Sequence, residues 1–221
     1  MIKNILKKVF LYNYWLRYKI QRDWMKRTST ENDNQLDIYW NDISDTRKTL
    51  IDLLYNLLNN NSNKHKSILE FGSHVGINLK LLSERLPGVK MFAVEPNVEA
   101  YEFLASNLPF IEVRNFDDVK FIHSDFPNQK INISFVNSVF YCMKPKKVLN
   151  VLEKLSSISE TIVIGDSMSN IEKTKSKFNQ EPIFYSHPYK MWLKELGYTK
   201  FKLIPLKNGQ LQLDAYLIAQ K

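Results

Sequence analysis

The residues best suited to ligand chemistry lie in the stretch ILEFGSHVGINLKLL, residues 68–82. Gly72 and Gly76 stand between a short apolar run and a helical pattern, and glycine permits backbone torsions and close approaches that a Cβ atom blocks. Such a strand–turn–helix presents free N–H groups at the carboxyl edge of a sheet, where ligands of open α/β folds bind. Glu95 ends the next apolar run, 19 residues after Gly76, where an acid could bind both hydroxyls of a ribose. We therefore expect a site for a ribose-containing ligand.

The elements around this turn alternate between short apolar runs and helical patterns, which is typical of a parallel sheet with helices on both faces. We expect strands over 67–71, 90–95, 119–123, 131–137 and 161–166, and helices over 77–86, 97–107 and 146–155. Two more strand-like runs, 198–205 and 211–219, flank Lys207-Asn208-Gly209, a hairpin signal. The sequence thus predicts an α/β fold with a doubly wound, mostly parallel seven-stranded sheet, a C-terminal antiparallel hairpin and additional N-terminal helices.

From residue 67 to about residue 166 the sequence resembles the class I S-adenosylmethionine-dependent methyltransferases. In that family an E/D-x-G-x-G-x-G turn holds the methionine and ribose portion, an acid ending the second strand binds the ribose hydroxyls, and an acid after the third strand contacts the adenine amine. The end of the fourth strand lies beside the sulfonium. The resemblance implies S-adenosyl-L-methionine as cofactor and assigns its binding, in that order, to Glu70, Gly72, Gly76, Glu95, Asp125, Asn137 and Ser138.

Residues 134–167 further resemble small-molecule and sugar-nucleotide methyltransferases of bacterial surface-glycan synthesis. This narrower resemblance implies O-methylation of a small hydroxylated acceptor such as a sugar or a glycan precursor. The sequence departs from the family at two positions. His74 replaces the usual middle glycine of the turn, and Asn132 stands where an acid often opens the fourth strand.

Two residues are candidate bases for removing the acceptor's proton. His187, in IFYSHPY, has an ordinary pKa suited to base work at neutral pH, and Asp166 closes the fifth predicted strand. Because a sulfonium is already a strong electrophile, positioning carries much of such a reaction and a strong base is unnecessary. His187 could equally be a structural residue packed between two tyrosines. Aromatic residues near it could roof a sugar-binding pocket: Phe184, Tyr185, Tyr189 and Trp192.

The same glycines bear on two other classes of function. An NAD(P)-dependent oxidoreductase has a G-x-G-x-x-G turn whose first and last glycines are five residues apart, whereas Gly72 and Gly76 are four apart. A non-catalytic S-adenosylmethionine-binding or scaffold protein of the same fold stays open. No Cys/His cluster is present, so we expect no metal site.

Composition describes one elaborated globular unit of 221 residues with a single cysteine, Cys142, which excludes a disulfide scaffold and fits a cytoplasmic location. We divide the chain into a basic amphipathic helix (1–27), a hinge and leading helix (28–66, with the helix over 39–58) and a Rossmann-like domain (67–221). Residues 1–27 hold eight Lys and Arg against one Asp, whereas the remainder is nearly neutral. The basic helix could pack on its own domain or a partner subunit, or attach to the inner face of an anionic membrane. Its large apolar residues argue against nucleic acid as a partner.

Overall fold

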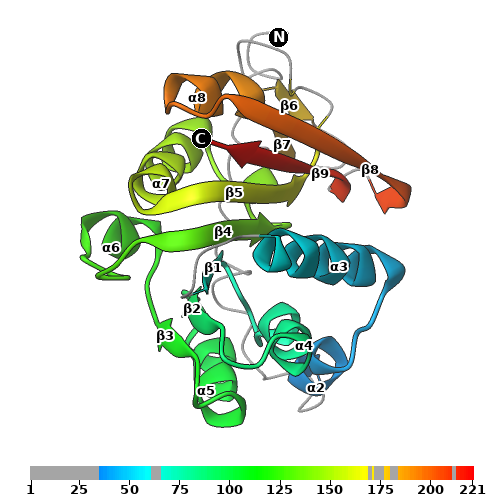
Figure 1. Cartoon of the computed structure of the whole chain (residues 1–221), viewed down its shortest axis with the longest axis vertical. Helices are drawn as coiled ribbons and strands as arrows, with labels where there is room; N and C mark the ends of the chain where they lie inside the picture. The colour runs from blue at the N-terminus through cyan, green and yellow to red at the C-terminus, as the bar shows by residue number, and fades with distance from the viewer. Residues whose placement is uncertain (1–34, 61–65, 169–170, 172–176, 180–183, 211–212) are drawn as a thin grey trace, which may run out of the picture.

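The computed structural model of the chain describes residues 35–60, 66–168, 171, 177–179, 184–210 and 213–221 (Figure 1). The basic segment 1–27 lies outside the described residues. None of the described helices is both long and apolar enough to cross a membrane.

The centre of the molecule is a seven-stranded sheet with the order β3-β2-β1-β4-β5-β9-β8. The first five strands in this order are parallel, whereas β9 pairs antiparallel with both β5 and β8. The predicted doubly wound, mostly parallel sheet with an antiparallel hairpin is therefore confirmed. The strands are β1 (Ser67–Phe71), β2 (Lys90–Val94), β3 (Glu112–Arg114), β4 (Ile131–Asn137), β5 (Ser159–Asp166), β8 (Lys200–Gln210) and β9 (Leu213–Gln220), with β6 (Lys177–Asn179) and β7 (Phe184–Ser186) forming a separate pair.

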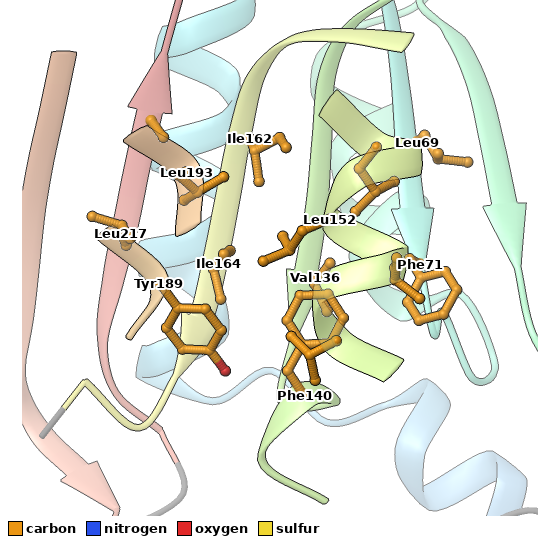
Figure 2. Close-up of a cluster of buried hydrophobic side chains, with 14 of the residues drawn as sticks. Leu69, Phe71, Val136, Phe140, Leu152, Ile162, Ile164, Tyr189, Leu193 and Leu217 are labelled. Carbon is orange, nitrogen blue, oxygen red and sulfur yellow. The ribbon is translucent and has the colours of Figure 1, made fainter. Parts of the chain in front are cut away.

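Helices cover both faces of the sheet, in two groups that Figure 1 shows. Alternation along each strand sends successive side chains to opposite faces, so Ile68 packs with the first group of helices while Leu69 and Phe71 pack with the second. Figure 2 shows the hydrophobic cluster on the face that carries Leu69 and Phe71, where Leu152 and Tyr189 lie beside residues of the strands. The first group is α2 (Gln35–Trp40), α3 (Asp45–Asn59), α4 (Ile77–Arg85) and α5 (Val98–Asn107), and the second is α6 (Asp118–His123), α7 (Pro145–Ile158) and α8 (Tyr189–Glu195).

The leading helix predicted over 39–58 is two helices, α2 and α3. Ser44 separates them because its backbone is extended and its hydroxyl accepts a hydrogen bond from the N–H of Arg47 (3.4 Å), which begins α3. Helix α3 then buries one side, Leu50, Leu54 and Leu58 included, against the sheet and α4. It is thus part of the hydrophobic core.

Two local predictions are wrong. The segment 119–123, predicted as the third strand, is helix α6, which begins where the Asp117 carboxylate accepts a hydrogen bond from the N–H of Lys120 (2.8 Å). The third strand is the preceding segment β3. The predicted turn at Asn208-Gly209 is absent too, because β8 runs on to Gln210 with an irregular register after Pro205.

Candidate functional site

The turn after β1 is built on three left-handed residues. Gly72, His74 and Gly76 have φ angles of 78°, 49° and 79°. A Cβ atom on Gly72 would lie 2.5 Å from Cγ2 of Val139, and one on Gly76 would lie 2.8 Å from the Leu104 side chain. Both glycines are therefore required by space as well as by torsion. His74 takes the left-handed conformation at the position where the family has its middle glycine.

A cavity of about 170 Å³ opens at the carboxyl edge of the sheet, beside this turn. It collects side chains from the ends of four successive strands, which is where ligands of doubly wound folds bind. Those used below are Gly72 and His74 after β1, Glu95 after β2, Asp117 and Asp118 after β3, and Ser138 after β4.

The Glu95 carboxylate is held by backbone donors on two loops. Its Oε2 atom accepts a hydrogen bond from the N–H of His74 (2.6 Å), and its Oε1 atom accepts one from the N–H of Asn97 (2.8 Å). Only 5% of the residue is exposed, and burial raises its pKa to about 7 despite these donors. Each carboxylate oxygen can accept a second hydrogen bond, so Glu95 is fixed in place with acceptor capacity left over.

Beneath the turn, Glu70 is almost completely buried. Its Oε1 atom accepts a hydrogen bond from Nδ2 of Asn78 (2.7 Å), and the Asn78 Oδ1 atom accepts one from Nε of Arg47 (3.0 Å). Burial is the main reason that the pKa of Glu70 rises to about 8, and the Asn78 hydrogen bond and the Arg47 charge both oppose that rise. Among the described residues the Oε2 atom of Glu70 has no hydrogen-bond partner, and the same holds for Oγ of Ser73 and Oδ1 of Asn137.

The structure brings most of the predicted cofactor residues to one edge. Gly72, Glu95 and Ser138 line the cavity. The other three, Glu70, Gly76 and Asn137, lie at the same ends of β1 and β4 without lining it.

Asp125 is the exception: its prediction as the acid that follows the third strand is wrong. It follows α6 rather than a strand, is exposed, and precedes the start of β4 at the amino edge of the sheet. The acids that follow the true third strand are Asp117 and Asp118, and both line the cavity. Their signal in the sequence was a pair of acids ahead of a short helix, the usual composition of a helix N-terminus.

The candidate bases lie on the opposite face of the sheet from Glu70. Asp166 accepts hydrogen bonds from the Tyr189 hydroxyl (2.9 Å) and from the N–H of Ser167 (2.7 Å), and its burial raises its pKa to about 8. His187 is fully buried, its Nε2 atom lies 3.0 Å from the carbonyl oxygen of Phe140, and burial lowers its pKa to about 4. Neither residue lines the cavity.

Three of the aromatic residues predicted to roof a pocket, Tyr185, Tyr189 and Trp192, pack around His187 instead. Tyr189 is buried among Ile164, Leu193 and Phe140 (Figure 2). His187 stacks on Tyr185 with ring centroids 5.5 Å apart, and Trp192 lies at the same distance on another side. This packing explains why His187 is buried.

No protein-family model matches the chain, and no curated protein sequence matches it. Solved structures do. Magnesium protoporphyrin IX methyltransferase from Synechocystis PCC 6803, with bound S-adenosylmethionine, is 10% identical over 93% of this chain and 97% of its own, with a TM-score of 0.64. An O-methyltransferase family protein from Burkholderia thailandensis is 8% identical over 95% of this chain and 70% of its own, with a TM-score of 0.63.

A third structure is the N-terminal domain of EvdMO1, solved in the presence of S-adenosylhomocysteine and D-fucose. It is 14% identical over 81% of this chain and 84% of its own, with a TM-score of 0.56. At these identities the likeness concerns the fold. The strand order, the glycine turn and these matches agree: the chain has the fold of the class I S-adenosylmethionine-dependent methyltransferases.

Proposed function

We propose that this protein is an S-adenosylmethionine-dependent methyltransferase whose acceptor is a small hydroxylated compound such as a sugar or a glycan precursor. The observation that carries the proposal is the convergence of the glycine turn, the buried Glu95 and the β3–α6 acids on one cavity. A strand–helix turn without a ligand needs no acids at the ends of the next two strands.

The residues present fit the cofactor. Glu95 has acceptor capacity for two ribose hydroxyls, and the unpartnered Oε2 of Glu70 offers an acceptor for an ammonium group. For the adenine amine we propose Asp117, because Asp118 already pairs with Lys147 across the cavity wall (2.9 Å). When bound, the cofactor supplies an electrophilic methyl group.

The chain's own part in the reaction is to orient the acceptor and exclude water. The Asp166 carboxylate already accepts from Tyr189 and Ser167, and Nε2 of His187 lies against the Phe140 carbonyl oxygen. Because both residues are thus engaged and neither lines the cavity, we propose that the acceptor's proton passes to solvent. A loss of kcat of about a hundredfold in Asp166→Asn, the size typical of a lost general base, would instead assign proton removal to that carboxylate.

The sugar acceptor rests on two supports. One is the resemblance of residues 134–167 to sugar methyltransferases, and the other is the similar fold of EvdMO1, whose structure was determined with D-fucose. The first test is isothermal titration of the protein with S-adenosylmethionine, S-adenosylhomocysteine and NADH. The second is to incubate the protein and S-adenosylmethionine with sugar nucleotides or with RNA, and to detect methylated products by mass spectrometry. Methyl transfer to RNA with none to sugars would refute the acceptor.

A non-catalytic cofactor-binding protein is the second candidate. It is favoured by the burial of both candidate bases. Saturable binding of S-adenosylmethionine, with no transfer to any hydroxylated acceptor, would support this candidate over the enzyme.

We also propose a cytoplasmic protein whose basic segment 1–27 attaches reversibly to an anionic membrane surface. The test is co-sedimentation with anionic liposomes at low salt, comparing the full chain with a shortened chain that begins at Thr28. Pelleting of the full chain alone is expected. If both chains stay in the supernatant, the segment serves the fold or a protein interface.

A further inference from the structure

The side chain of Arg47 links helix α3 to the proposed cofactor site. Its Nε atom donates to Asn78 on α4, and Asn78 donates to Glu70 at the end of β1. Arg47, Asn78 and Glu70 thus form a continuous chain of hydrogen bonds across three elements. Asn78 and Glu70 are 5% and 1% exposed, so the inner part of this chain is removed from water.

The outer end of the chain is fixed as well. Nη1 of Arg47 forms an ion pair with Oδ2 of Asp42 (2.6 Å) and donates to the Asp42 carbonyl oxygen. The backbone around Arg47 is tied at Ser44, which caps the helix, and at Thr46, whose carbonyl oxygen accepts from the hydroxyl of Tyr216 (2.9 Å). The guanidinium therefore has one defined position relative to α4, and its planar shape lets it bind two partners at once.

The inner end of the chain is incomplete. Glu70 is a buried carboxylate with one oxygen bonded to Asn78 and the other without a hydrogen-bond partner among the described residues. A buried charge is stable only when it is paired or fully hydrogen-bonded. The charged or titratable groups that face Glu70 are Arg47 from α3, which favours its ionised form, and Glu95 after β2, which disfavours it.

We propose that Arg47 is a positioning residue of the cofactor site: acting through Asn78, it orients Glu70 and favours its ionised form, so that Oε2 receives the ammonium group of the amino-acid portion of the ligand. The inference rests on the proposed function. It assigns a role to a residue 20 positions before the first strand, outside every motif of the turn. The ammonium would complete the hydrogen bonds of Glu70.

The test compares two ligands by isothermal titration on the full chain. S-adenosylhomocysteine carries the amino-acid portion, whereas 5′-methylthioadenosine has the same nucleoside without it. Arg47→Gln should weaken S-adenosylhomocysteine binding about fivefold at pH 7, a size typical of coupling within one hydrogen-bond network. It should leave 5′-methylthioadenosine binding unchanged. Since loss of the Arg47 charge raises the pKa of Glu70, the weakened affinity should recover as the pH rises toward 9.

Arg85→Gln is the matched control. Arg85 also joins α4 to α3, through Asp52, but it is partly exposed and makes no contact with Asn78 in the described structure. It should change neither affinity. Asn78→Leu should reproduce the Arg47→Gln effect, and the double variant should be no worse than either single one. Where Arg47→Gln does not fold, Arg47→Lys keeps the charge and should give a smaller effect in the same direction.

A readout without ligand is ¹³C NMR titration of the Glu70 carboxyl, whose pKa should rise in Arg47→Gln. An equal loss for both ligands, an unchanged Glu70 titration, or the same loss in Arg85→Gln overturns the inference. If the wild-type protein binds 5′-methylthioadenosine and binds S-adenosylhomocysteine no more tightly, the inference fails while the nucleoside site stands. If it binds neither ligand, both proposals fail.

Discussion

Glu95 gives the sharpest prediction, because its pKa lies close to neutrality. At about 7, this pKa means that half of the free protein carries a protonated Glu95 at neutral pH. Ribose hydroxyls donate to the ionised form, so protons compete with the ligand. The apparent Kd then scales as 1 + 10^(pKa − pH), and affinity should be about tenfold weaker at pH 6 than at pH 8.

Substitution with glutamine should abolish this dependence. Glu95→Gln removes the charge and turns an NH₂ group toward one of the two backbone N–H donors, His74 or Asn97. A hydrogen bond to a charged group contributes roughly 1.5–3 kcal/mol, so the variant should bind about ten- to a hundredfold more weakly at pH 8. Between pH 6 and pH 8 its affinity should stay constant.

The assay is isothermal titration with 5′-methylthioadenosine, which reaches the ribose site without involving the amino-acid portion and Glu70. Glu102→Gln is the control, because Glu102 is an exposed carboxylate on α5 and its loss changes the net charge equally. Wild-type affinity that does not fall below pH 7, or a Glu95→Gln variant that still weakens on acidification, would refute the assignment of Glu95 to the ribose.

Three further predictions concern stability and the adenine end of the site. Gly72→Ala should lower the free energy of unfolding, measured by urea denaturation, by about 2–4 kcal/mol, since it adds a clash to a left-handed torsion. Gly88→Ala should lower it by only about 1–2 kcal/mol, because Gly88 is also left-handed but a Cβ atom there would meet no atom within 4 Å. Burial raises the pKa of Asp166 from 3.8 to about 8, so between these pH values the folded state holds a proton that the unfolded state releases. The free energy of unfolding therefore falls as the pH rises from about 4 to about 8, and Asp166→Asn should reduce the slope of this fall by up to about 1.4 kcal/mol per pH unit. Asp117→Asn should weaken 5′-methylthioadenosine binding about tenfold and Asp125→Asn should not, as measured by titration calorimetry.

The core strands could be predicted from sequence because burial on both faces leaves short runs rich in large apolar residues. Strands β1 and β4 have the predicted bounds for this reason. Strand β3 could not be predicted in this way, since it is only three residues long and has a charged residue at each end. The apolar run over 119–123 was the stronger strand signal, yet it belongs to a helix that buries Phe121 and leaves Val119 52% exposed.

The site was predictable to the extent that it follows strand ends. Gly72 and Glu95 reach the cavity because each directly follows a parallel strand. Asp166 also ends a strand, but alternation along β5 turns it toward Tyr189 on the other face. The burial of His187 could not be predicted, because its partner, the carbonyl oxygen of Phe140, is 47 residues away and no local sequence pattern encodes that contact.

The hydrogen bond between Tyr216 and Thr46 joins residues 170 positions apart, and this separation bears on how the protein is made. During synthesis α3 emerges long before β9, so the hydrogen bond from Tyr216 to Thr46 forms only when β9 has joined the sheet beside β5. Long-range contacts of this kind form late, after the loop-closure entropy of the intervening chain has been overcome. The last tie on the backbone next to Arg47 consequently depends on the C-terminal strand. A nascent chain can thus complete the glycine turn well before it acquires a finished ligand site.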